Sequence, residues 1–174
     1  MTRNTRNFNL DPPKKVKNLD ELFTIGDPFE LIFTLNGLIN CQSEDDYRKL
    51  PEAARMVVAL DAFHLEVENG GFEQFLFTAS GNLSGDLKDY LCKIGAHKTC
   101  ELLEKVAASF PGGVIPEDRA ARKKIMDRLE DECDDRELFE KETKDYHKGG
   151  EHILELLIAW LKPRKQEFGT YLEK

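Results

Sequence analysis

The sequence predicts an all-α protein, a compact multi-helix bundle of about eight helices that forms a single domain. Apolar residues recur at helical spacing after Asp20, and no run of alternating β-branched residues indicates a strand. Glycine and proline divide these stretches into segments of ordinary helix length. A hydrophobic fraction of 40% with 11 Phe residues is enough to fill one core in a chain of 174 residues.

The first helix signals surround Asp27. This residue is a suitable N-cap, and Pro28 fits the first helical position, so a helix is expected over residues 28–40. A short turn is expected to begin at Ser43. A longer helix starts near Pro51 and carries one continuous apolar face, formed by Met56, Leu60, Phe63 and Val67.

The segment NGGFEQFLFTASGN, residues 69–82, is the most specific short motif. Its paired glycines permit the left-handed backbone that ends a helix, so the helix is expected to stop there and a new one to cover residues 72–79. The segment lacks the GxxxxGK[ST] pattern of a phosphate-binding loop. We therefore interpret it as a structural corner, with the motif residues Asn69, Gly70, Gly71, Phe72, Gln74 and Phe75.

In the second half of the chain, glycine and proline again mark the expected helix boundaries. Two helices are expected over residues 84–94 and 97–110, separated by Gly95, and Pro116 begins the signature of another N-terminus. The buried side of that next helix is expected to contain Ile125, Met126 and Leu129. After a break in helical phase, further helices are expected over 135–147 and 151–161, with a glycine hinge between them.

Charge divides the chain into a basic arm, residues 1–19, and a helical domain, residues 20–174. The arm holds five Lys and Arg residues against one Asp, whereas the whole chain has a net charge of −8. An acidic domain repels phosphates, so direct binding to nucleic acid is disfavoured.

Membrane and redox classes are also constrained by composition. The longest apolar stretch is too short to span a membrane, and no apolar segment follows the basic N-terminus as in a signal peptide, so a cytoplasmic protein is expected. The four cysteines include no CxxC pair. They are interpreted as reduced core thiols rather than a zinc site or a dithiol redox centre, and no cofactor is predicted.

Residues 127–145 form the strongest charge feature, with ten carboxylates against four cations. Carboxylates one helical turn apart are separated by about 5.4 Å along the axis, a spacing comparable to that of successive phosphates in a nucleic acid strand. A dense patch of this kind indicates either a solvated face that serves solubility or a binding site for a cationic partner, such as the basic surface of a DNA-binding protein. The predicted partner-binding residues are Asp127, Glu130, Asp131, Asp134, Asp135 and Glu137.

Two other functional classes remain open. Asp61, His64 and Glu68 lie at helical offsets of three and four, so they are a candidate for part of a metal site in a small metal-dependent enzyme. Alternatively, the chain is an immunity or scaffold protein that binds its partner through an apolar groove. Binding that survives high salt would distinguish such a groove from an acidic surface.

Three motifs resemble the bacterial DNA-mimic protein domain: NGGFEQF at 69–75, SGN at 80–82 and LCKIGAHKTCELLEKVAASFPGG at 91–113. The resemblance implies an all-helical, non-enzymatic protein that can form a homodimer. It also implies that acidic side chains replace duplex phosphates at the DNA-binding face of a transcription regulator. The matching residues mark the fold and are not catalytic, so the acidic stretch provides the independent link to function.

Overall fold

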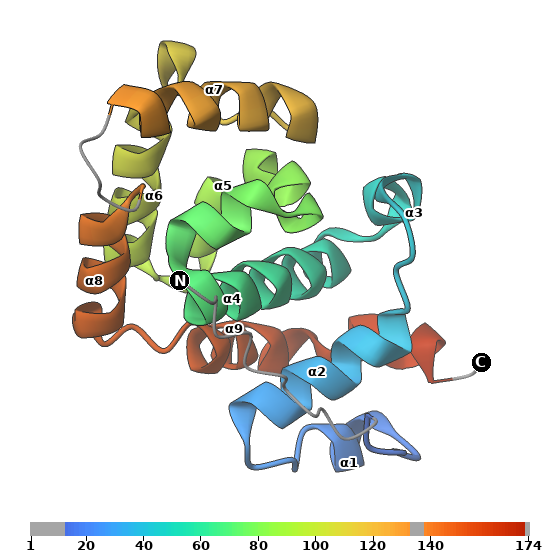
Figure 1. The fold of residues 1–174 in the computed structure, drawn as a ribbon. Coiled ribbons are helices and arrows are strands. Elements are labelled where there is room, and N and C mark those ends of the chain that lie inside the picture. The colour runs from blue at the N-terminus through green and yellow to red at the C-terminus, as the bar shows by residue number, and fades with distance from the viewer. Residues whose placement is uncertain (1–12, 133–137, 173–174) are drawn as a thin grey trace.

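A computed structural model describes residues 13–132 and 138–172. All regular secondary structure in these ranges is helical, which confirms the all-α prediction (Figure 1). No helix in these ranges is long and apolar enough to cross a membrane. The α-helices are α1 (Leu19–Leu22), α2 (Pro28–Ile39), α3 (Glu44–Lys49), α4 (Glu52–Phe77), α5 (Ser84–Ile94), α6 (His97–Ala108), α7 (Arg119–Glu132), α8 (Glu140–Gly149) and α9 (Ile153–Leu161), and the short 3-10 segments are η1 (Ala79–Leu83), η2 (Pro111–Gly113) and η3 (Lys162–Tyr171).

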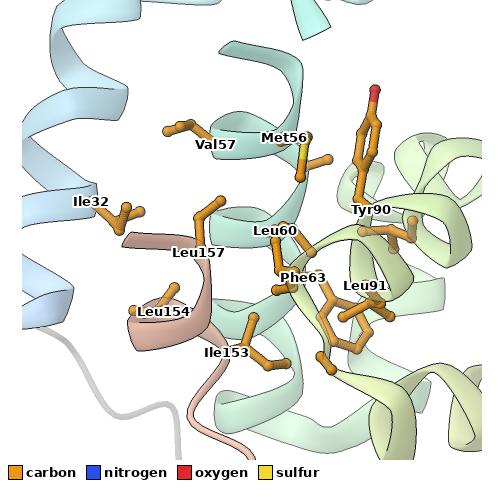
Figure 2. Packing of buried hydrophobic residues seen from close by; sticks show 14 of the residues in the cluster. Ile32, Met56, Val57, Leu60, Phe63, Tyr90, Leu91, Ile153, Leu154 and Leu157 are labelled. Carbon is orange, nitrogen blue, oxygen red and sulfur yellow. The ribbon is translucent and has the colours of Figure 1, made fainter. Parts of the chain in front are cut away.

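Helix α4 is the central element of the fold. Helices α2, α5, α7, α8 and α9 all pack against it. Its predicted apolar face is buried, and in Figure 2 Leu60 and Phe63 lie between Leu91 of α5 and Leu157 of α9. The core is therefore one continuous cluster around α4, and the other helices form a shell around it.

Side-chain caps set several helix starts where the sequence predicted them. Asp27 accepts a hydrogen bond from the Glu30 amide at 2.7 Å, at the start of α2. Ser43 accepts one from Asp46 at 3.1 Å, at the start of α3. Asp118 accepts one from Ala121 at 2.7 Å, immediately before α7. Each cap satisfies an amide that has no partner within the helix, which is why these boundaries could be read locally.

The last helix starts later than predicted because Glu151 caps a different helix. Helix α9 begins at Ile153, and the Glu151 carboxylate accepts hydrogen bonds from the backbone amides of Lys98 and Thr99 at 2.9 and 2.7 Å. Helix α6 has no side-chain cap of its own at this end. Burial raises the pKa of Glu151, but the hydrogen bonds from Thr99 and Lys98 outweigh it and lower the pKa below 4.5.

The backbone leaves the helical conformation at Gly70 and Gly71, where the sequence predicted that one helix ends and the next begins, and the label α4 covers the helical segments on both sides. Gly71 has φ 74° and ψ −171°, a conformation that only glycine adopts readily. The helical hydrogen bonding is interrupted there, and the Phe72 amide instead donates to Thr143 Oγ1 of α8 at 3.2 Å. The predicted break is therefore confirmed, and the helical segment that starts at Phe72 ends at Phe77, two residues before its predicted end.

Other boundaries also depend on tertiary contacts. Helix α8 begins at Glu140, after Phe139 adopts a positive φ of 60°, and the predicted start at residues 135–137 lies outside the described ranges. The sequence did not predict α1 or η3. Both are anchored by buried side chains, Leu22 in α1 and Phe168 in η3.

The described end of the basic arm, residues 13–18, lies against α2. The Lys14 ammonium forms an ion pair with Glu30 at 2.8 Å, and the Lys14 amide donates to Thr34 Oγ1 at 3.3 Å. Pro13 packs over Gly37, where a Cβ atom would lie 3.0 Å from the proline ring. At least one cation of the arm therefore rests on a carboxylate of the helical domain.

Replacing Gly71 with alanine is expected to destabilise the fold by about 2 kcal/mol or more. The added Cβ would lie 2.5 Å from Thr143 Oγ1 and would also be strained at this φ. Urea unfolding followed by circular dichroism would measure the loss. Gly26→Ala is a matched control, because no atom lies within 4 Å of its Cβ position, and it should unfold like the wild type. Equal stability of the two variants would contradict the assigned role of Gly71.

Candidate partner-binding surface

The position of α7 is fixed by Arg122, a side chain with 0% exposure. Its Nε donates to Leu76 O at 2.9 Å. Its Nη1 donates to Pro116 O and Glu117 O at 2.8 and 2.6 Å, and its Nη2 to Thr78 O and Asn82 Oδ1 at 2.9 and 2.7 Å. These five bonds use all five N–H groups of a guanidinium. Burial lowers the pKa of Arg122, but an arginine remains charged in proteins.

The SGN motif at residues 80–82 forms the receptor for this guanidinium. Asn82 accepts one of its bonds, and a Cβ atom at Gly81 would lie 2.8 Å from Arg122 Nε. Ser80 donates to Glu66 of α4 at 3.1 Å, and Gln74 donates to the same carboxylate at 3.1 Å. Two of the motifs identified in the sequence therefore act together: they hold the corner of α4 and attach α7 to it.

The predicted acidic residues that the structure describes lie on the outer face of α7. Asp127, Glu130 and Asp131 are exposed, whereas Met126 is buried and Leu129 is half-buried. This placement agrees with the outward arc expected from the helical spacing. The remaining predicted partner-binding residues, Asp134, Asp135 and Glu137, lie outside the described ranges.

Carboxylate charge on α7 is concentrated at its C-terminal end. Asp127 is neutralised by Lys123, whose ammonium lies 2.7 Å from the carboxylate. The first half of the helix also carries Arg119 and Lys124. By contrast, none of the exposed carboxylates at the end of α7 forms an ion pair with a described residue: Glu130, Asp131 and Glu132.

The end of α7 borders an apolar recess. The recess has a volume of about 300 Å³ and is lined by Pro111, Leu129, Glu132 and neighbouring residues of α7 and of the segment that follows α6. Phe110, at its base, stacks on Phe139 at a centroid distance of 6.4 Å, and Phe139 directly precedes α8. The acidic end of α7 and the start of α8 therefore meet at the same aromatic pair.

The structure does not gather Asp61, His64 and Glu68 into a metal site. Asp61 is buried and accepts a hydrogen bond from Asn36 of α2 at 2.6 Å. His64 instead faces α8, where its Nδ1 lies 3.3 Å from the Tyr146 hydroxyl. Within residues 13–132 and 138–172, no group of three or more His, Cys, Asp or Glu side chains is arranged to hold a metal ion.

Asp61 is an unusual core residue. One carboxylate oxygen is bonded to Asn36, while the other is buried and has no partner among the described residues. Burial raises the pKa of Asp61 to about 6, and the Asn36 hydrogen bond opposes this only in part. The ionised form therefore destabilises the folded state at neutral pH.

The cysteines are less uniform than the sequence indicated. Cys100 is buried and Cys41 is half-buried, but Cys92 is exposed, so describing all four as core thiols was wrong for Cys92. Cys133 lies outside the described ranges. The exposure of Cys92 follows from its position on the outer face of α5, one residue after the buried Leu91.

The comparison with protein families agrees with the resemblance that the corner motif indicated. The model of a family described as DMP19-like protein matches residues 48–164, well over half of the chain. The chain belongs to the DMP19-like family. This confirms the predicted resemblance to DNA-mimic proteins. No curated protein and no solved structure matches the chain. The DMP19-like match extends from the end of α3 through α9, so it includes the corner, Arg122 and the acidic end of α7.

Arg122 was missed by the sequence reasoning, although a signal was present. It lies three and four residues before Ile125 and Met126, so it falls on the apolar face of α7. A cation on a buried face needs nearby acceptors, and the sequence does not show which carbonyl groups supply them.

The change of the free energy of unfolding with pH should report the raised pKa of Asp61. Because its folded pKa is raised above the usual 3.8 to about 6, its contribution is fully favourable below pH 3.8 and is lost as the pH rises through 6. The wild type should therefore lose roughly 1–2 kcal/mol relative to Asp61→Asn between pH 5 and 7.5. Urea unfolding at several pH values measures this difference. A difference between the wild type and Asp61→Asn that does not change with pH would refute the raised pKa.

Replacing Arg122 with lysine is expected to destabilise the protein by about 3 kcal/mol or more. An ammonium has three donors and cannot reach five acceptors, so buried carbonyl groups would lose their partners. Chemical denaturation provides the measurement. Arg128→Lys is the matched control, since Arg128 is exposed on the same helix and, among the residues that the structure describes, it donates a hydrogen bond to the Lys124 carbonyl alone. If both variants unfold at the same denaturant concentration, Arg122 does not anchor α7.

Proposed function

We propose that the protein is a non-enzymatic interaction protein that presents carboxylates to the DNA-binding surface of a basic partner. Membership of the DMP19-like family suggests a DNA mimic. The observation that carries the proposal for this chain is the group of exposed carboxylates at the end of α7, which form no ion pair with any residue in the described ranges. The proposal has two further parts: the partner is a transcription regulator, and residues 127–137 form the contact surface.

A rigid display of charge favours this role. Exposed carboxylates that lie close together on one helix repel each other, so their arrangement contributes no stability to α7. A cationic partner would relieve this repulsion and would be steered toward the surface. Because Arg122 fixes α7 before binding, a partner would not have to pay for ordering the helix.

The described residues do not support the alternative hypothesis of a metal-dependent enzyme. Asp61 contacts Asn36 of α2, whereas His64 and Glu68 contact Tyr146 and His147 of α8, so the three candidate ligands do not meet at one point. On α7, Asp127 forms an ion pair with Lys123, whereas the exposed carboxylates at the end of the helix form none with a described residue. This distribution matches a charged recognition surface.

The decisive variants are Glu130→Gln and Asp131→Asn, made together. Asp127 is left unchanged because Lys123 already neutralises it. Removing two unpaired charges should slow association and weaken binding by about fivefold or more at low salt, with little change in stability. The matched control is Glu155→Gln with Glu167→Gln, which removes the same charge from exposed positions in α9 and η3.

Binding is measured after partner proteins have been captured from cells of the source organism on immobilised protein. Each captured protein is then titrated by surface plasmon resonance with the wild type and both double variants. Duplex DNA is added as a competitor, since a mimic and DNA occupy the same surface. Release by duplex DNA together with weaker binding of the α7 variant would support the proposal. Captured partners that retain their affinity for the α7 variant and ignore duplex DNA would eliminate it.

The apolar-groove alternative is favoured by one observation. A second recess of about 300 Å³ lies between α5 and α6 and is lined by Leu103, Ala107 and the 67% exposed Val114. A partner held there would bind through apolar burial, and its affinity would survive high salt. The same titration, repeated across salt concentrations, separates the two modes.

A further inference from the structure

Cys92 and Cys100 are brought into contact by the turn between α5 and α6. Gly95 ends α5 at φ 82°, and the Ala96 amide donates to Leu91 O at 2.9 Å, which fixes the reversal. The two helices pack against each other as a helical hairpin. Cys92, at the end of α5, and Cys100, in the first turn of α6, then have their Sγ atoms 3.0 Å apart.

The two thiols differ in exposure. Cys92 is exposed, so a small oxidant in solution can reach its sulfur, whereas Cys100 is buried. Burial raises the pKa of the Cys100 thiol, and its hydrogen bond with Cys92 raises it further. Lys88, one turn before Cys92, holds a positive charge at this end of the hairpin and pairs with Glu104 of α6 at 2.5 Å. The exposed Cys92 is therefore the sulfur that an oxidant meets first, and the buried Cys100 is the sulfur that can pair with it afterwards.

We propose that Cys92 and Cys100 are a redox modification site that forms a reversible disulfide within the α5–α6 hairpin. The sequence pointed the other way, because the two cysteines are eight residues apart and form no CxxC motif. The distance between the two cysteines in sequence does not decide whether they can pair, because the turn between α5 and α6 brings them together. A disulfide has an S–S distance of about 2.0 Å, so closing it requires the sulfurs to approach by roughly 1 Å.

A peroxide is the oxidant class that fits an exposed first sulfur. The Cys92 thiol loses its proton and the thiolate attacks one oxygen of hydrogen peroxide, so that the O–O bond breaks and a sulfenic acid forms. The departing hydroxide takes up the proton that the thiol lost and leaves as water. The Cys100 sulfur then attacks the sulfur of Cys92, its proton joins the departing hydroxide as a second water, and the S–S bond forms. Two thiols give two electrons to the peroxide. Added dithiol reverses the reaction by exchange.

Cys41 is the internal control. Its thiol donates to the Ser43 carbonyl at 3.4 Å, and no described cysteine contacts it. Cys41→Ser should therefore leave disulfide formation unchanged, whereas Cys92→Ser and Cys100→Ser should each abolish it. Circular dichroism of both variants confirms that the fold persists, so that a lost bond is not confused with a lost structure.

The test uses the purified full chain, reduced and then treated with stoichiometric hydrogen peroxide. Intact mass should fall by two hydrogen atoms without dimerisation, and proteolysis should yield a peptide joined through Cys92 and Cys100. Dithiothreitol should restore the original mass. The oxidised form should also have a higher Tm than the reduced form, because the link restricts the unfolded chain.

Other products would overturn the proposal. A gain of oxygen that remains on Cys92, a disulfide between two chains, or a bond that uses Cys41 or Cys133 would each show that the hairpin does not close. An unchanged mass would do the same if a maleimide reagent labels Cys92 in a parallel sample, because the sulfur is then accessible but does not pair.

Discussion

A single buried guanidinium joins three parts of the chain that are distant in sequence. Arg122 donates to the end of α4, to η1 through Asn82, and to the segment before α7. All its acceptors are neutral oxygens, so the charge is balanced by oriented dipoles instead of a carboxylate. Such a site is unfavourable unless every donor is satisfied. The geometry of the corner and of α7 is therefore determined together, and neither can shift without leaving buried donors or acceptors unpaired.

This coupling gives a physical reason for the glycines of the corner. Gly81 leaves the space that the guanidinium occupies, and Gly71 lets α8 approach α4 closely enough for Thr143 to receive the Phe72 amide. The two glycines thus serve opposite sides of the same corner, one toward α7 and the other toward α8. The acidic stretch, residues 127–145, includes the second half of α7 and the start of α8. Motif residues that contribute no charge themselves determine where that charge is displayed.

Local signals predicted the helices that carry their own caps. Asp27 and Ser43 bond to amides three residues away, so the starts of α2 and α3 could be read directly. The main error occurs where the partner comes from elsewhere in the chain: Glu151 caps α6, and α9 starts later than predicted. The candidate surface follows the same division. Helical spacing predicted that Asp127 faces outward, but neutral acceptors for Arg122 and the contact between Cys92 and Cys100 arise only from folding.

The distribution of charge along α7 limits what the acidic surface can contribute. Lys123 cancels Asp127, and the last five residues of α7 contain three carboxylates and one cation, Arg128, so the surplus negative charge lies at the last turn. A patch of this size accelerates encounter more than it holds a complex together, because exposed charges are strongly screened. The recess lined by Pro111 and Leu129 adjoins that turn, so a partner bound to the carboxylates also meets apolar surface. Charge at the rim and apolar contact beside it is the division of roles found in specific protein interfaces.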